Sequence, residues 1–269
     1  MFEMVTLPAP DESLASFWQD IVETHSPETI EVVGSALIQI FAFLLPALGY
    51  QVFDLCFPQT SQASKLQRAE KQPSNRMIWR CIGLALFNHS MLIGGHAVQA
   101  YFIIGSMFRV EKQLPSTTEV LTHFVAAIFL REILFYYVHR ILHIKFFYRH
   151  LHHVHHQFPA PIALAAVHSH PIDHMMQNAL PIALPMILLR SHFLTVVLFA
   201  TVALLDAALA HSGYDFFRVP AKVSMHDLHH MTSKGGYGVL GLMDWVHGTS
   251  SPEVYPKELL DEKQGERVH

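Results

Sequence analysis

The sequence predicts an all-α, polytopic membrane protein with four to five transmembrane helices, two of them paired as a bent hairpin, and a histidine-rich helical cap. Of its 269 residues, 51% are hydrophobic and only 15% are charged, whereas a soluble domain carries nearer a quarter charged residues. The apolar residues also gather into long uninterrupted runs. The third observation is the content of 21 histidines, which exceeds the 18 lysines and arginines together.

The chain divides into three predicted parts. Residues 1–30 form an N-terminal segment that lacks the basic start and apolar core of a signal peptide. Residues 31–249 form a single membrane-embedded domain, and residues 250–269 form a polar tail. Two scattered cysteines make neither a disulfide framework nor a metal-binding spacing. The formal charge of −4 is too small to indicate a nucleic-acid partner.

Five apolar runs are candidate spans, judged against the roughly 20 residues that a helix needs to cross the hydrocarbon core. They are residues 32–57, 77–108, 120–138, 175–189 and 193–210. The last two are shorter and are separated only by "RSH", which predicts the hairpin. Pro181 and Pro185 should bend its first arm, which neighbouring helices make tolerable.

The loop between the first two spans sets the predicted orientation. It holds a cluster of basic residues, Lys65, Arg68, Lys71 and Arg76. The positive-inside rule places such a loop in the cytoplasm. Alternating from there, the third span returns to the cytoplasm with His139 at its end, and the hairpin brings His211 to the same side. The clustered histidines should therefore meet on the cytosolic face.

Three histidine motifs carry the predicted chemistry. "HRILH" has i,i+4 spacing, and "HHVHH" and "HDLHH" both have i,i+3,i+4 spacing, which on a helix puts the named side chains on one face. A metal site needs such convergence, with nitrogens about 2 Å from the ion. These candidate ligands are His139 and His143, then His152, His155 and His156, then His226, His229 and His230. In a helix through residues 150–156, the side chain of His153 should point away from those of the candidate ligands.

The number of imidazoles predicts the kind of metal centre. Eight exceed what one ion coordinates, so two ions are implied. Imidazole suits zinc, copper, iron and nickel, but structural zinc would use only four ligands and leave half unexplained. A histidine-rich pair of irons is the most economical interpretation. Arg140 and Asp227, inside the motifs, would orient the imidazoles, although surface ion pairing explains them as well.

A glycine motif, "GYGVLG" at residues 236–241, literally matches a dinucleotide-binding fingerprint. That fingerprint has meaning only between a strand and a helix, and no apolar strand precedes it here. We therefore expect no nucleotide site. The glycines should instead let the chain turn closely beneath the third histidine motif.

Several segments together carry a family resemblance: "EILFYYVHRILH", "FYRHLHHVHHQFPAPI", "SHPIDH", "AHSGYD", "HDLHHM" and "YGVLGLMDWVHGT". Over about residues 84–249 the chain resembles the fatty acid hydroxylase/sterol desaturase superfamily of membrane non-haem di-iron oxygenases. It looks closest to the C-4 methylsterol oxidase branch and to fatty acid hydroxylase domain-containing protein 2.

The resemblance implies further ligands and a cofactor system. It adds His211 of "AHSGYD" to the ligands and His170 of "SHPID" as a further candidate. It implies two irons, O2 as co-substrate, and electrons from NAD(P)H through cytochrome b5 or a similar donor. It also implies residence in the endoplasmic reticulum membrane. The side chains that would line a lipid path, with plain packing as an equal alternative, are Phe135, Tyr136, Tyr137 and Met231.

The implied reaction is oxidation of an unactivated C–H bond, with C-4 methyl oxidation of a sterol, or oxidation of a terpenoid, favoured. Hydroxylation or desaturation of a fatty acid or sphingolipid is the alternative within the superfamily. Two other classes stay open. A metal transporter should hold its ligands inside the spans, whereas here they follow the spans, and a non-catalytic membrane protein could use the metal structurally.

Overall fold

The computed structural model describes residues 12–214 and 222–250. The predicted tail from residue 251 onward lies outside the described residues. Within the described ranges the chain contains helices and no strand, as predicted. The elements are α1 (Glu12–Thr24), α2 (Pro27–Ile38), η1 (Gln39–Leu44), α3 (Leu45–Cys56), α4 (Pro58–Ser64), η2 (Ala69–Lys71), α5 (Asn75–Val98), η3 (Gln99–Ile103), α6 (Thr117–Leu142), α7 (Lys145–His150), η4 (His152–Gln157), η5 (Ala163–Val167), α8 (Pro171–Asp173), η6 (His174–Ala179), α9 (Leu180–Leu188), α10 (Phe193–His211), α11 (Lys222–Thr232) and α12 (Leu242–His247).

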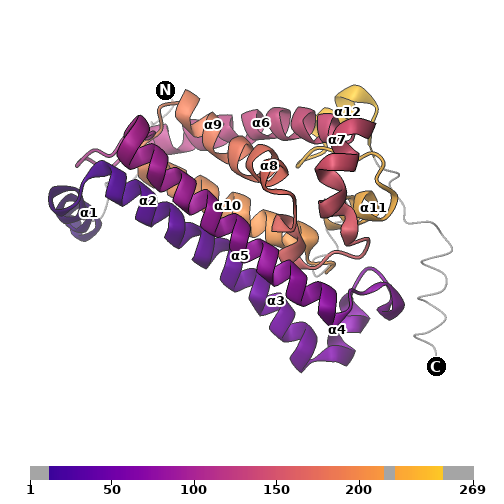
Figure 1. Ribbon diagram of the computed structural model, residues 1–269. Coiled ribbons are helices and arrows are strands. Elements are labelled where there is room, and N and C mark those ends of the chain that lie inside the picture. Colours follow the sequence, from indigo (N-terminus) through magenta and orange to yellow (C-terminus); the bar gives the residue numbers. More distant parts are fainter. Residues whose placement is uncertain (1–11, 215–221, 251–269) are drawn as a thin grey trace, which may run out of the picture.

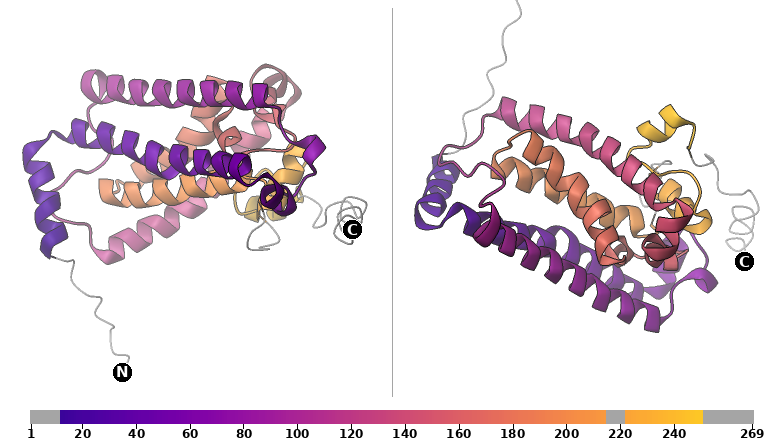
Figure 2. Two further views of the ribbon diagram at one scale, coloured as in Figure 1. Left: turned by 90° about the horizontal axis from the view of Figure 1, so that it is seen from below. Right: turned by 45° about the horizontal axis from the view of Figure 1, so that its top comes forward.

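Four helices are long and apolar enough to cross a membrane. They are Pro27–Cys56, Asn75–Ile103, Thr117–Leu142 and Phe193–His211. The first two each contain a π-helical segment, η1 and η3. The helices lie side by side at one end of the molecule and spread towards the other, with α10 between α6 and the α2–α3–α5 layer (Figures 1 and 2). The predicted count of four to five spans is confirmed with four.

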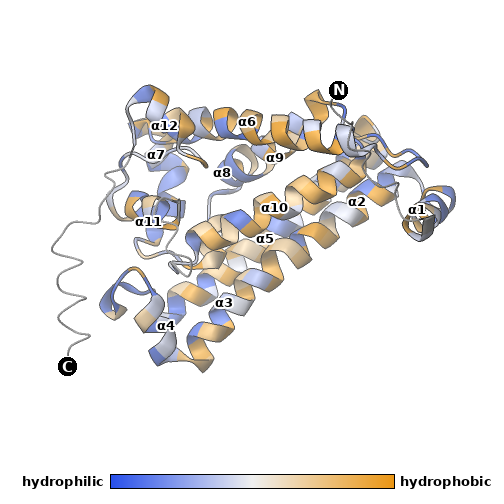
Figure 3. Ribbon diagram, turned by 180° about the vertical axis from the view of Figure 1, so that it is seen from behind, coloured by the Kyte–Doolittle hydropathy of each residue, from blue (hydrophilic) through white to orange (hydrophobic). Residues whose placement is uncertain are grey.

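The fifth apolar run forms the first arm of the predicted hairpin. It consists of α8, the π-helical η6 and α9, and it turns at Leu189–His192 into α10. Pro181 and Pro185 both lie inside the continuous helical arm that η6 and α9 form, where each removes one backbone N–H donor. The outer faces of the bundle are strongly apolar (Figure 3). Phe41 and Phe102 are 65% and 82% exposed, as expected for side chains that face lipid.

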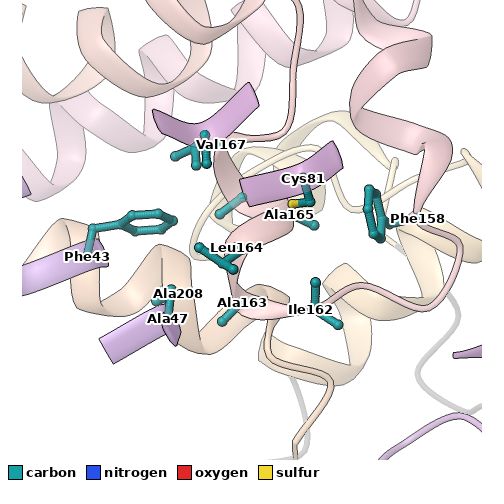
Figure 4. Close-up of a cluster of buried hydrophobic side chains, with 12 residues drawn as sticks. Phe43, Ala47, Cys81, Phe158, Ile162, Ala163, Leu164, Ala165, Val167 and Ala208 are labelled. Atoms are coloured by element: carbon teal, nitrogen blue, oxygen red, sulfur yellow. The ribbon is translucent and has the colours of Figure 1, made fainter. Parts of the chain in front are cut away.

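A short 3₁₀ helix of small residues, η5, lies at the centre of the core (Figure 4). All five of its residues are buried, and it packs against α3, α5 and α10. The side-chain amide of Asn88 on α5 donates to the carbonyl oxygens of Val167 and Ser169, each at 2.9 Å. The bond to Ser169 satisfies a carbonyl that would otherwise be buried without a partner, and the bond to Val167 adds to the one from the N–H of Ser169. They fix the segment that follows the second histidine motif.

The cap gathers at the end where the helices spread, and it comprises α4, α7, η4, α11 and α12 (Figure 1). The loop after α4 is bonded into it. Lys65 Nζ donates to Asp54 Oδ2 at 3.1 Å and to the carbonyl of Ser212 at 3.0 Å, and Gln67 Nε2 donates to Asp227 Oδ2 at 2.8 Å. The basic loop and the histidines thus share one end of the molecule. That this end faces the cytosol stays a prediction.

Candidate metal centre

Nine histidines converge in two adjacent clusters inside the cap. The five-histidine cluster consists of His139, His143, His152, His156 and His229, and the four-histidine cluster of His155, His211, His226 and His230. In each cluster one nitrogen from every residue lies within 4.8 Å of the others. The structure therefore brings together all eight residues of the three motifs and His211.

The second and third motifs each serve both clusters. We expected each motif to present one helical face, with the second motif on an α-helix through residues 150–156. The first motif does so, since His139 and His143 share one cluster, but the expectation is wrong for the second and third motifs. The α-helix ends at His150, and the second motif forms the 3₁₀ helix η4. Because adjacent residues of a helix diverge by about 100°, His155 and His156 join different clusters, as do His229 and His230. His153 is exposed, as expected.

The outer nitrogens of four of the imidazoles are fixed by acceptors. Carbonyl and carboxylate oxygens can only accept, so each Nδ1 bonded to one carries the proton and leaves a lone pair on Nε2. Such outer partners set the tautomer of metal-binding histidines. The bonds run from His139 Nδ1 to Tyr237 O at 2.9 Å, from His229 Nδ1 to Gly235 O at 2.7 Å, from His211 Nδ1 to Ala207 O at 2.9 Å, and from His152 Nδ1 to Asp173 Oδ2 at 2.9 Å.

The inner nitrogens approach each other closely. Nε2–Nε2 distances are 3.2 Å for His152–His156, 3.3 Å for His155–His211, 2.8 Å for His211–His226 and 3.2 Å for His226–His230. At such separations two imidazoles are joined either by a proton carried on one nitrogen or by a cation that both lone pairs bind. Ligands about 2.1 Å from one ion and about 90–110° apart are separated by about 3.0–3.4 Å. The donor set and its spacing therefore fit one metal ion in each cluster.

Three inner nitrogens of the five-histidine cluster support the same fit. The buried Nε2 atoms of His139, His143 and His229 have no hydrogen-bond partner within the described ranges. Buried polar atoms without partners are costly, at about 1–3 kcal/mol each. A coordinated ion would satisfy all three.

Burial also keeps these imidazoles neutral, which is the form that binds metal. Desolvation lowers the pKa of His229 to about 3. It likewise lowers the pKa values of His155, His156, His226 and His230 far below the usual range, and neighbouring imidazoles lower them further. Ions need not displace protons from these sites at neutral pH.

A cavity of about 160 Å³ opens beside the four-histidine cluster. Its wall includes His155, His211 and His226 and otherwise consists largely of apolar groups such as Ile182 and Leu204. Among the described residues, none of the five-histidine cluster lines it. A site with four protein ligands that faces a cavity can leave a coordination position open to a small molecule.

Of the four side chains predicted to line the lipid path, only Phe135 lies in the wall of this cavity. Tyr136 is fully buried elsewhere, with its ring stacked 5.0 Å from that of His247. Tyr137 is exposed, and its hydroxyl contacts His247 Nε2 at 3.1 Å. Met231 is absent from the lining that the described residues form, and Met225, on the cavity side of α11, takes its place.

The remaining candidate residues have other contacts. Arg140 donates to the hydroxyl of Tyr136 at 2.8 Å. Asp227 is buried and accepts from Gln67, which ties α11 to the basic loop. His170 lies in neither cluster of the described residues, and its Nδ1 accepts from the backbone N–H of Ile172 at 3.2 Å at the start of α8.

Two buried carboxylates support the histidines and were not predicted. Asp173, 1% exposed, holds His152, and the signal for it was its place in "SHPIDH", beside two histidines. Glu132, fully buried, accepts backbone N–H groups from Val239 and Leu240 at 2.8 Å each and from Met243 at 3.0 Å. Its signal was a lone acid in an apolar run.

The glycine motif wraps around Glu132. A Cβ atom on Gly238 would lie 2.6 Å from Glu132 Oε1, so only glycine fits this close approach. The carboxylate of Asp244 accepts from the N–H groups of Tyr237 and Gly238 at 2.9 and 2.6 Å. This loop presents the carbonyl oxygens of Tyr237 and Gly235, which orient His139 and His229. The chain therefore turns closely beneath the third histidine motif, as we expected from the glycines.

Apolar spans that end in two buried histidine clusters define a multi-pass membrane protein with a site suited to two metal ions. Residues 124–249 match the family described as fatty acid hydroxylase, so this part of the chain is a fatty acid hydroxylase domain. The resemblance stated from the histidine motifs is confirmed.

The curated relatives differ in their named activities. The chain is 31% identical over 189 residues to human fatty acid hydroxylase domain-containing protein 2, which covers 70% of this chain and 56% of the relative. It is 27% identical to very-long-chain aldehyde decarbonylase GL1-8 of Oryza sativa subsp. indica, and that match covers 93% of this chain and 96% of the relative. It is also 27% identical to methylsterol monooxygenase 2-2 of Arabidopsis thaliana, where the match covers 88% of this chain and 93% of the relative. The chain therefore spans about half the length of the human relative. No solved structure matches it.

Proposed function

We propose that this protein is a membrane-bound di-iron monooxygenase that oxidises an unactivated C–H bond of a lipid. The observation that carries the proposal is the pair of histidine clusters, one of which lines a cavity next to the membrane spans. O2 would be the co-substrate. Electrons would come from NAD(P)H through cytochrome b5 or a similar donor, and the protein would reside in the endoplasmic reticulum membrane with its cap in the cytosol.

The five- and four-histidine clusters would each hold one iron, and the ions would supply the binding and reduction of O2. The chain's own residues have three tasks. The acceptors on Nδ1 keep the inner nitrogens ready to bind. Burial of the clusters excludes water, and the cavity presents one substrate carbon beside His155, His211 and His226.

A sterol with a C-4 methyl group, or a terpenoid, is the favoured substrate. The relative named methylsterol monooxygenase covers most of this chain, which supports this choice. Fatty-acyl or sphingolipid hydroxylation or desaturation is the second candidate, because other relatives carry hydroxylase names. Lipid profiles of cells with and without the gene distinguish the two candidates. A change in 4-methylsterols would support the sterol substrate, and a change in 2-hydroxy fatty acids would support the fatty-acyl substrate.

The metal and the ligands are tested on purified protein. Protein prepared anaerobically with ample iron should contain two irons per chain, which react with O2. His155→Ala and His229→Ala remove one ligand from each cluster and should abolish the lipid change, whereas His153→Ala, an exposed neighbour, should not. Zinc alone under these conditions, or activity that persists in His155→Ala, would contradict the proposal.

A further inference from the structure

A partly buried ion pair lies in the cavity wall inside the spans. Arg131 on α6 and Asp206 on α10 approach to 3.5 Å between Nη1 and Oδ2, with side chains 13% and 20% exposed. Both residues belong to helices that can cross a membrane, and both line the cavity that reaches the four-histidine cluster. Ionisable groups at such positions are costly and mark substrate or ion pathways.

The same wall carries further polar groups that need a partner. The guanidinium of Arg131 has five N–H donors, and its Nη2 reaches the carbonyl of Ala203 only at 3.5 Å. Gln177 and Ser169 also line the cavity. Their Oε1 and Oγ atoms are buried without a hydrogen-bond partner in the part of the chain that is described. A ligand that carried only hydrocarbon would leave these groups unsatisfied.

The pair lies close to the cluster along α10. Asp206 precedes His211 by five residues, which is about 7.5 Å along the helix axis. Both side chains line the same cavity, so a molecule that is bound at Asp206 reaches the cluster without leaving it. A polar group bound at the pair would therefore sit near the carbon that is oxidised.

The charges of the pair select the polar group. Arg131 can donate and Asp206 can accept, and a hydroxyl group does both. A carboxylate would be attracted by Arg131 but repelled by Asp206. A carbonyl could use only the donor. We propose that Arg131 and Asp206 bind the hydroxyl group of an alcohol-bearing lipid and so place a carbon a few bonds away at the four-histidine cluster.

This inference rests on the proposed function, and it is tested by binding rather than by turnover. Full-length, metal-loaded protein in nanodiscs is titrated with a 4-methylsterol, its 3-deoxy analogue and the analogue with a carboxylate at C-3. Loss of one charge-assisted hydrogen bond corresponds to a factor of about 10 to 100 in affinity. The wild type should prefer the alcohol over the deoxy analogue by such a factor.

Asp206→Asn should abolish this preference. It should also gain affinity for the carboxylate, because Arg131 then remains as the uncompensated charge, and a structural role for Asp206 would not produce that gain. The double variant Arg131→Gln/Asp206→Asn removes both charges and replaces the single variant as the test if the latter does not fold. It should bind the alcohol and the deoxy analogue with equal affinity. Glu119→Gln, which disrupts the Arg109–Glu119 pair near the other end of α6, is the matched control and should keep the preference.

Three results overturn the assignment: no preference of the wild type for the alcohol in either the sterol pair or the octadecanol pair, a preference that survives in both variants, or no binding of any alcohol. Octadecan-1-ol and octadecane form a second probe pair. If the wild type prefers octadecanol over octadecane and ignores the sterol pair, the sterol substrate is wrong while the hydroxyl assignment stands.

Discussion

Replacing Glu132 by glutamine tests the support of the five-histidine cluster. The carboxylate accepts three backbone N–H groups from the loop over residues 239–243. The glutamine side chain has nearly the same shape as glutamate, but an NH2 group, which donates hydrogen bonds, replaces one of the two accepting carboxylate oxygens. If the amide oxygen takes the place of Oε2, it still accepts from Val239 and Leu240, and its NH2 group then faces the N–H of Met243.

The magnitude follows from these three bonds. Hydrogen bonds to a charged group contribute about 1.5–3 kcal/mol each, and neutral ones about 0.5–1.5 kcal/mol. Glu132→Gln loses one charged bond and weakens two others by about 1 kcal/mol each, so the loop should be destabilised by about 4 kcal/mol. Asp244 still holds the loop at Tyr237 and Gly238. We therefore expect displacement of the loop rather than global unfolding.

The displacement should reach the metal site, because the same loop supplies the carbonyl acceptors of His139 and His229. Loss of an outer hydrogen bond typically lowers metal affinity about 10- to 100-fold. Chelator competition on the purified protein measures this affinity, and thermal unfolding measures the destabilisation. Glu119→Gln places the same substitution elsewhere on α6. Wild-type metal affinity in Glu132→Gln, or an equal loss in Glu119→Gln, would refute the reasoning.

Three further predictions concern the same core. Asp173→Asn should lower metal affinity about 10- to 100-fold by freeing His152, and chelator competition should show no added loss in a His152→Ala background; an equal loss there would assign Asp173 another role. The lowered pKa of His229, about 3 in the fold against about 6.5 unfolded, means that the unfolded chain takes up protons first. Stability of the metal-free protein should be constant above about pH 6.5 and fall below it by about 1.4 kcal/mol per pH unit for each such histidine; equal melting temperatures at pH 7.5 and 5.5 would contradict this. Asn88→Ala leaves the carbonyl of Ser169 without a donor and that of Val167 with only the N–H of Ser169, and it should destabilise the protein by about 1–3 kcal/mol for the orphaned group; an unchanged melting temperature would show that other groups replace the amide.

The spans and the ligand motifs were predictable because both depend on local pattern. Apolar runs of sufficient length predict membrane-spanning helices, and repeated histidine spacings predict a metal site. The division of the motifs between two clusters was not predictable from the spacing alone. Adjacent histidines such as His155 and His156, or His229 and His230, point about 100–120° apart on a helix, and only the fold shows that partners lie in both directions. Glu132 and Asp173 were missed for a related reason. Their partners lie far away in the sequence, at Val239 and His152, and only the fold brings them together.

The domain boundaries and the cytosolic orientation stay predictions, since the described contacts do not depend on either. The lining residues show how sequence proximity misleads. Tyr136 and Tyr137 adjoin Phe135 in the chain, yet helical rotation turns them to the C-terminal end of α12, where they contact Thr249 and His247, and only Phe135 faces the cavity.

The interleaved clusters also constrain how the protein can be made. Each cluster needs residues from η4 and α11, which are separated by about seventy residues that include the membrane hairpin. Neither site is complete while the ribosome is still adding α9 or α10, so an ion captured early would have only part of its coordination shell. The proposed metal loading would then follow synthesis and insertion of nearly the whole chain. A chain whose hairpin inserts wrongly would complete neither site, so ion capture would report on correct assembly.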